Sequence, residues 1–272
     1  MLIHGERLVI VVVTDPINDE NSTVGEAADV IDGDLTGGIS AVNDDVDTGD
    51  FDYYSNSVKL AIIAILFAFA AHAEVTITID RNAGAAATPA FRFAHVPSPA
   101  KDDAASASKV ELIAGTVDRG SAGLAALTDG RLPGTEDEPE ANLFFRGDSW
   151  GGRFRIDLGA VTDIGEVNSY SWHPDTRAPQ VYRVYASDGT DPGFNPAPGV
   201  KVDPATCGWR EVAFVDTRTQ EGDGGGQYGV SITDTTGSLG RYRYLLFDVF
   251  ETEGDDPWGN TFYSEIDVVA KK

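Results

Sequence analysis

The sequence is short of cysteine, methionine and basic side chains. Its 272 residues include one Cys, one Met and 20 Lys or Arg against 44 Asp or Glu, so the net charge is -24. A single cysteine excludes an intrachain disulfide framework and any zinc or iron–sulfur site with several Cys ligands. Nucleic-acid binders concentrate positive charge where they meet the phosphates, so the composition argues against that class.

Histidine is also scarce, and this weighs against a serine hydrolase. The segment Gly147-Asp-Ser-Trp-Gly-Gly152 contains a Gly-Asp-Ser triplet of the kind found at some nucleophilic serines. Such a serine needs a histidine base within hydrogen-bond reach. Only His95 and His173 follow residue 73, and no His follows residue 173. We interpret the triplet as part of a loop that leads into a strand.

Acidic residues are so abundant that a catalytic pair could always be chosen among them by eye. A glycosidase needs two carboxylates about 5–10 Å apart across its substrate, and sequence spacing in strands and loops does not show this. The acidic cluster at 136–140 is typical of a solvated loop. We therefore predict a protein that is not an enzyme, and a small glycosidase or lyase is the alternative, because a fold alone does not exclude a function.

Glycine and proline are plentiful, with 30 Gly, 13 Pro and 42% hydrophobic residues. This composition indicates a folded, loop-rich and β-rich globule and not a disordered chain.

The charge is distributed unevenly along the chain. Residues 1–57 carry 13 Asp or Glu and one Arg. Apart from the apolar run 8–13, which has the character of one strand, we predict that this acidic extension is largely disordered.

Residues 58–73 resemble a secretory signal peptide. Val58-Lys59 precedes an apolar run at 60–71, and Ala71-His72-Ala73 is a small-x-small cleavage motif. The run is too short for a stable membrane span, which needs about 20 apolar residues. We predict cleavage after Ala73 and a secreted, extracellular or periplasmic protein. A buried core helix is the alternative reading of this run.

A signal peptide that begins at residue 58 is out of place, and the sequence suggests why. Met1 is the only methionine. Bacterial genes often start at GTG, which is read as Val within a frame, and Val58 stands where an initiator would. Our hypothesis is that residues 1–57 are a mis-assigned upstream start and that the mature protein is 74–272.

Beyond residue 74 the hydrophobic period becomes two, which indicates strands. Only part of 103–113 has a helical period. Turn signals such as Asp188-Gly189 and Gly224-Gly-Gly226 separate the strands. This pattern predicts an all-β fold, an antiparallel β-sandwich of jelly-roll type. The predicted strands are 75–79, 91–93, 154–158, 180–187, 212–214, 241–250 and 262–269.

From residue 124 onward, the order of segments resembles the discoidin domain. This family, also called the coagulation factor V/VIII type C domain, belongs to the galactose-binding-like β-sandwich superfamily. We expect 121–272 to be the discoidin-like sandwich and 74–120 to add accessory strands. Residues 192–204 and 221–229 have no counterpart in the family. The matching pieces are Ala126-Leu-Thr-Asp-Gly130, Trp150, Phe154-Arg-Ile-Asp-Leu-Gly159, Ile164-Gly-Glu-Val167, Tyr182-Arg-Val-Tyr-Ala-Ser-Asp-Gly189, Gly208-Trp-Arg-Glu-Val212, Gly240-Arg-Tyr-Arg-Tyr-Leu245 and Tyr263-Ser-Glu-Ile266.

The resemblance implies a non-catalytic carbohydrate-binding module that recognises a glycan or cell-surface polysaccharide through loops at one end of the sandwich. An indole can pack on a sugar ring while charged groups bond its hydroxyls. Trp172 can equally be a core residue. The alternative function is an extracellular protein-interaction or structural module without a sugar site. The expected ligand residues are Trp172, His173, Asp175 and Arg177 in one loop, and Trp258 and Asn260 in a later one.

The resemblance also implies one structural Ca²⁺ ion. Relatives hold it between an Asp-Gly turn and a glutamate near the C-terminus, which correspond here to Asp129 and Glu265, with Thr135 as a weaker match. Hard oxygen ligands, including backbone carbonyls of 130–136, are what Ca²⁺ selects. In the alternative reading, Asp129 only caps its turn and Glu265 is an ordinary strand residue.

Overall fold

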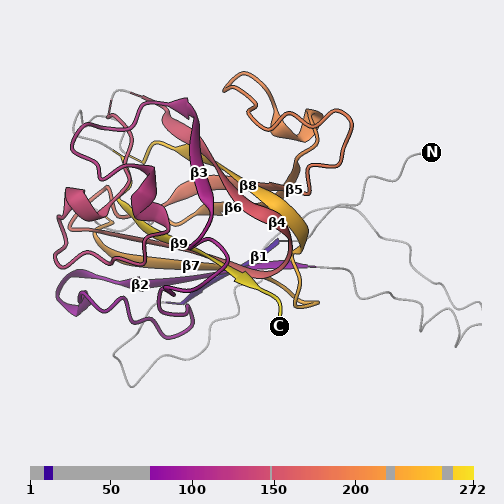
Figure 1. The fold of residues 1–272 in the computed structure, drawn as a ribbon. Coiled ribbons are helices and arrows are strands. Elements are labelled where there is room, and N and C mark those ends of the chain that lie inside the picture. The colour runs from indigo at the N-terminus through magenta and orange to yellow at the C-terminus, as the bar shows by residue number, and fades with distance from the viewer. Residues whose placement is uncertain (1–8, 15–73, 148, 219–223, 253–259) are drawn as a thin grey trace, which may run out of the picture. The chain divides into compact units, whose positions relative to one another are not determined.

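The computed structural model describes residues 9–14, 74–147, 149–218, 224–252 and 260–272, with the backbone alone for 9–14. These residues form strands joined by loops and four short 3-10 turns, so the predicted all-β fold is confirmed (Figure 1). The strands are β1 Val9–Thr14, β2 Val75–Asn82, β3 Lys109–Gly115, β4 Gly151–His173, β5 Val181–Ser187, β6 Arg210–Asp216, β7 Gly226–Asp234, β8 Gly240–Phe250 and β9 Tyr263–Ala270.

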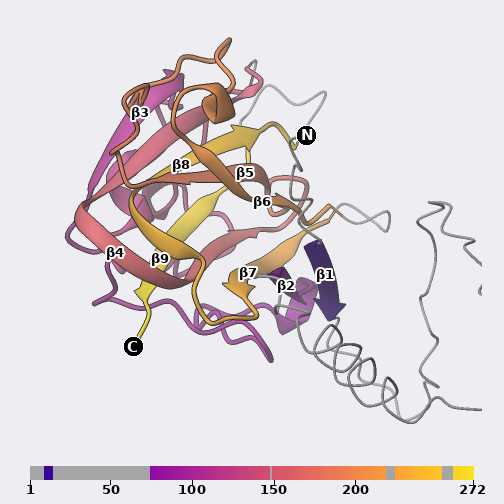
Figure 2. The same cartoon turned by 90° about the vertical axis from the view of Figure 1, so that its right-hand side faces the viewer.

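The nine strands are joined by hydrogen bonds into one continuous sheet that folds into two layers, here called the two sheets of the sandwich, and the long strand β4 belongs to both. Its first half, up to Asp157, pairs with β3 and β8, and β8 continues to β5 and β6. Its second half pairs with β9 and β7, and β7 continues to β2 and β1. The register between β4 and β8 shifts between Asp157 and Thr162, and Gly159 between them has a positive φ of 78°. Figure 2 shows β8, β5 and β6 as adjacent strands.

The strands form where the sequence alternates or where it is apolar throughout. Val75, Ile77 and Ile79 of β2 point into the core, and the residues between them are partly exposed. In β8 the run from Leu245 to Val249 is buried on both faces, because alternate residues face the main core and Leu246 packs on the other side against Trp209. Burying each large apolar side chain contributes about 1.5–3 kcal/mol, so this alternation fixes which face turns inward.

The main core lies between the two sheets. Phe154 of β4 and Phe247 of β8 stack with ring centroids 5.1 Å apart, and Tyr182 of β5 lies 5.4 Å from Phe247. Tyr263 of β9 completes the group from the opposite sheet, 6.3 Å from Tyr182. Each of these rings is buried. The aromatic residues therefore join both layers.

Three sequence predictions of local structure were wrong. The segment 91–93 is not a strand, because Phe91 takes a positive φ of 42° and turns its buried ring onto Trp172. The helical period within 103–113 is overridden by pairing of Lys109–Gly115 with β4. The glycine-rich stretch 221–229, interpreted as a loop, contains the start of β7, where an added Cβ on Gly229 would lie 2.6 Å from the Phe93 ring.

The predicted strand at 8–13 is confirmed as β1, which pairs in parallel with β2. All described strands belong to one compact unit, residues 1–16 with 73–272. The rest of the acidic extension and the predicted signal segment lie outside the described residues. Within the part of the chain that the structure describes, no helix is long and apolar enough to span a membrane.

Candidate functional site

The predicted ligand loop, residues 173–178, connects the end of β4 to the start of β5. It turns through a hydrogen bond from the Ala178 N–H to the Asp175 carbonyl, 2.9 Å. A second loop packs against it so closely that a Cβ added to Gly225 would lie 1.9 Å from the Pro174 carbonyl oxygen. Arg81 of β2 holds that second loop by donating from Nη2 to the Gly225 carbonyl, 2.7 Å. The ligand loop is thus packed against a second loop that is itself held by β2.

His173 is a buried residue at the base of the loop, and its side chain is only 4% exposed. Its Nδ1 lies 2.6 Å from Asp175 Oδ1, its Nε2 lies 3.9 Å from Asp137 Oδ1, and its ring meets Phe262 edge-on at 4.8 Å. Burial lowers the pKa of His173, and the charge of Arg177 acts in the same direction. Asp175 and Asp137 oppose this shift.

The Nδ1 atom of His173 has two competing partners. The Asp175 backbone N–H lies 3.2 Å away and can donate to an unprotonated Nδ1. A protonated Nδ1 would instead donate to the Asp175 carboxylate at 2.6 Å. One nitrogen cannot do both, because the neutral imidazole has one donor and one acceptor. The protonation state of His173 therefore sets what holds Asp175 in place.

Arg177 is half-buried at the far end of the loop. Its carbonyl accepts a hydrogen bond from the Phe262 N–H at 3.0 Å, and its guanidinium lies 5.7 Å from the centroid of the Phe262 ring. This is within the range of a cation–π contact. Phe262 therefore contacts both His173 and Arg177 and organises the two side chains around one ring.

The other predicted ligand residues lie apart from this group. Trp172 is buried, meets Phe91 edge-on at 5.8 Å, and has no hydrogen-bond partner for Nε1 among the described residues. The Trp172 indole packs inside the protein beneath the start of the loop and presents no ring face to solvent. Asn260 is fully buried and donates to the Arg146 carbonyl at 3.4 Å. Trp258 lies outside the described residues.

Sequence reasoning missed Phe262 and Asp137, the two side chains that join the loop to the rest of the site. Phe262 was assigned only to a strand, and Asp137 only to a solvated acidic loop. Neither carried a local signal, because both approach His173 from segments that are distant in the sequence.

Two of the predicted calcium residues meet at the Gly130 turn. Glu265 of β9 is buried and its Oε2 accepts the Gly130 N–H at 2.9 Å. Asp129 is exposed and its Oδ1 accepts the Arg131 N–H at 2.7 Å. Burial raises the pKa of Glu265 to about 9, and the negative charges of Asp267, Asp129 and others act in the same direction. Without a cation, the neutral carboxyl form is thus favoured.

The fit to a calcium ion is partial. The two carboxylates that flank the Gly130 turn are the hard oxygen donors that Ca²⁺ prefers. Thr135, however, is exposed, and its hydroxyl is directed to the Asp137 carbonyl at 3.5 Å. Among the described residues, no three His, Cys, Asp or Glu side chains converge as a metal-binding group. Any further ligands would therefore be backbone oxygens or water.

Comparison with known proteins gives matches only among solved structures. No family model matches the chain, and the search of curated proteins gave no match. The similar structures include carbohydrate-binding modules and lectin domains, and some are modules of glycoside hydrolases.

Three of these structures illustrate the range. The lectin domain of lectinolysin, solved with Lewis B antigen, is 13% identical, with 63% of this chain and 98% of that chain covered and a TM-score of 0.39. A fucose-binding module of Streptococcus pneumoniae is 12% identical over 63% and 99%, with a TM-score of 0.37. Chitosan-binding module 1 of a Paenibacillus chitosanase/glucanase is 15% identical over 62% and 99%, with a TM-score of 0.38. The sandwich assignment rests on the strand pairing of this chain itself.

Proposed function

We propose that this chain is a discoidin-like, non-catalytic glycan-binding module whose site is the loop 173–178. One observation carries the proposal. Asp175 and Arg177, a hydrogen-bond acceptor and a donor, project from a loop whose conformation is fixed by the buried His173 and by Phe262. Ligand sites typically combine a few well-placed polar groups with a preformed surface. The printed names of the similar structures agree with this class of ligand.

The chemistry of the loop suits sugar hydroxyls. The Asp175 side chain is 50% exposed and can accept hydrogen bonds from hydroxyls. Arg177 presents several N–H donors in a planar, directed arrangement. We propose Trp258 as the aromatic platform, because the described aromatic rings of the site, Trp172 and Phe262, are both buried.

A glycan array followed by calorimetric titration of any hit tests this proposal. We expect Arg177→Ala and Asp175→Asn to weaken binding about tenfold or more, because each removes a charge-assisted hydrogen bond. Arg119→Ala, which removes an exposed arginine from a turn after β3, is the matched control. Unchanged affinity in both site variants would refute the assignment. If no glycan binds and a pull-down from culture supernatant retains a protein, the interaction-module alternative replaces it.

We further propose a calcium ion at the Gly130 turn, held by Asp129 and Glu265 with backbone oxygens. A bound cation would favour the ionised form of Glu265 and so offset the cost of its burial. Thermal melting with calcium and with EDTA tests this. We expect a lower midpoint in EDTA for the native chain and no difference for Glu265→Gln. Equal midpoints for the native chain in both solutions would remove the ion from the proposal.

Export remains part of the proposal. We expect the natively secreted product to be 74–272, with cleavage after Ala73. The mass of the secreted protein measures this directly. A secreted product that retains residues 1–57 would contradict both the cleavage site and the mis-assigned start.

A further inference from the structure

A cleft of about 660 Å³ lies at the other end of β5 from the loop 173–178. Its walls are the segment that follows β5, the residues around the start of β6, and the start of β8. Most of these walls belong to residues 188–209, a long connection that includes the insertion 192–204 (Figure 1, orange loop beside β5). Of the residues that line the cleft, only Pro192 and Gly193 belong to the insertion 192–204, and the others lie on either side of it or at the start of β8.

The connection 188–209 is held against β4 by a buried arginine. Arg153 of β4 forms a two-pronged ion pair with Asp248, with Nε–Oδ1 at 3.0 Å and Nη2–Oδ2 at 2.7 Å. Its remaining nitrogen, Nη1, donates to the carbonyls of Pro198, Gly199 and Val202 at 3.0–3.1 Å. A single side chain thus fixes three backbone positions of the loop. Such a loop is preorganised, which lowers the entropy cost of binding a ligand.

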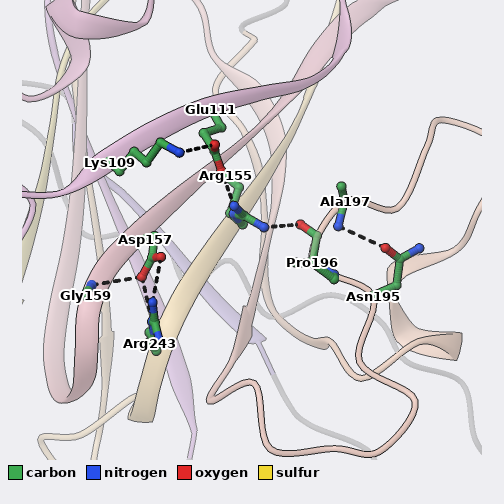
Figure 3. Close-up of polar contacts among 9 residues, drawn as sticks. All are labelled: Lys109, Glu111, Arg155, Asp157, Gly159, Asn195, Pro196, Ala197 and Arg243. Carbon is green, nitrogen blue, oxygen red and sulfur yellow. Dashed lines mark hydrogen bonds and ion pairs between the residues drawn. The ribbon is translucent and has the colours of Figure 1, made fainter.

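A second arginine holds the loop at its edge. Arg155 donates from Nη1 to the Pro196 carbonyl at 2.7 Å and pairs with Glu111 of β3 (Figure 3). Aromatic packing adds a third restraint. Phe194 stacks on Tyr244 at 5.2 Å, and the Trp209 indole N–H donates to the Asn195 carbonyl at 2.8 Å. These contacts fix the middle of the connection, between the two stretches that line the cleft, and Trp209 is itself a wall residue.

Two arginines give the cleft its chemical character. Arg210 and Arg241 both line it and both are exposed. Neither forms an ion pair with any acidic side chain that the structure describes, although the chain carries a net charge of -24. Among the described residues, the Arg210 side chain has one polar contact, from Nη1 to the Tyr242 hydroxyl at 3.5 Å. Two guanidinium groups thus remain available to an anionic group beside a tyrosine.

Acceptors line the same cleft. Asp188 and Asp191 each use Oδ1 to accept hydrogen bonds within their own turns, from the N–H groups of Thr190 and Gly193. These bonds fix the carboxylates in position. The hydrogen bonds from Thr190 also lower the pKa of Asp188, so this carboxylate is ionised at neutral pH.

We propose that this cleft is a second saccharide-binding site and that it takes a sugar bearing a carboxylate. A uronic acid residue offers one carboxylate to Arg210 and Arg241, hydroxyl donors to Asp188 and Asp191, and a ring face to Tyr242. Guanidinium–carboxylate pairs are among the stronger and more directional polar contacts. The inference does not depend on the loop 173–178, which lies at the opposite end of β5.

Cys207 makes occupancy of this cleft directly measurable. It is the only cysteine of the chain, it lines the cleft, and its thiol is partly exposed. Burial raises the pKa of the thiol, so alkylation by iodoacetamide should be followed at mildly alkaline pH. The probe is trimannuronate, and the neutral trisaccharide mannotriose is its matched control. We expect trimannuronate to slow alkylation of Cys207 in proportion to occupancy and mannotriose to have no effect.

Single-residue variants then assign the effect to the cleft. Arg210 and Arg241 are both exposed, so replacing either with Ala should leave the fold intact. We expect Arg210→Ala and Arg241→Ala each to raise about tenfold the concentration of trimannuronate that halves the alkylation rate of Cys207. Arg119→Ala and Arg177→Ala should leave it unchanged, and melting curves should confirm that all four variants are folded. No protection of Cys207, equal protection by mannotriose, or protection that survives both cleft variants would overturn the proposal. None of these results depends on whether the loop 173–178 binds a glycan.

Discussion

Individual side chains in this protein act mainly by fixing loops that carry little regular structure. His173 and Phe262 hold the loop 173–178, and Arg153 holds the connection 188–209. In both places a buried polar group replaces the hydrogen bonds that a sheet would otherwise supply. Its loss should therefore affect a whole loop and not a single contact.

The pKa of His173 is open to direct measurement. Burial lowers it, so the folded chain favours the neutral imidazole. The NMR titration of the ring protons, assigned with His173→Gln, should give a midpoint below the value of about 6.5 for free histidine. The stability from this group is present above that unfolded-state pKa and is lost as the pH falls through the folded-state pKa. A midpoint above 6.5 would mean that Asp175 and Asp137 outweigh burial and Arg177.

Removing Arg153 should be among the most damaging single changes. Its side chain is 4% exposed and that of Asp248 10%, so Arg153→Met leaves a buried carboxylate without its partner. We expect the free energy of unfolding in urea to fall by about 3–5 kcal/mol. The double variant Arg153→Met with Asp248→Leu should recover much of this loss, because no charge remains buried. A loss below 1 kcal/mol in the single variant would show that the pair contributes little to stability.

Among the strands, β2, β5 and β8 were predictable and β7 was not. Val75 to Ile79 alternates in the sequence as it does in the sheet, and the apolar run of β8 predicts a covered strand. Glycines at 226 and 229 hide β7, since each is required by a neighbour that approaches too closely for a side chain. The long course of β4 through two sheets was also not evident, because Gly159 and its neighbours resemble a turn.

The candidate sites were predictable to different degrees. Spacing along the chain placed His173, Asp175 and Arg177 together, because they share one loop. It did not decide whether Trp172 faces a ligand or the core, and in the structure Trp172 is buried against Phe91. The cleft beside the connection 188–209 was not foreseen, because the arginines that hold this connection are on a strand 40 or more positions away.

A substitution at Gly225, which precedes β7, tests how closely this segment packs against the loop 173–178. A Cβ there would lie 1.9 Å from the Pro174 carbonyl oxygen, so Gly225→Ala should displace one of the two backbones. We expect a loss of about 1–3 kcal/mol in the free energy of unfolding, measured in urea. Gly199→Ala is the matched control, because nothing lies within 4 Å of its added Cβ. If the two variants are equally stable, the approach of these loops is not a packing constraint.

For the chain overall, charge is the dominant property. With a net charge of -24, the excess acidic side chains repel one another in the compact state. Added NaCl should therefore raise the melting temperature by screening that repulsion. Exposed pairs such as Arg183–Glu211 and Arg218–Asp216 act in the opposite sense, but such pairs contribute little. Sucrose, which stabilises without screening, is the control. A melting temperature that falls with NaCl would show that attraction between paired charges is the larger effect.

The shared strand β4 has a consequence for how the molecule opens. Because one continuous strand is hydrogen-bonded within both sheets, neither sheet can separate from its neighbours without disrupting a strand that the other also uses. The amide protons of the two halves of β4 should therefore exchange with solvent deuterium at similar, slow rates and only through global unfolding. The sandwich would then have no independently opening layer, and the loops at both ends of β5 would keep their positions for as long as the fold itself persists.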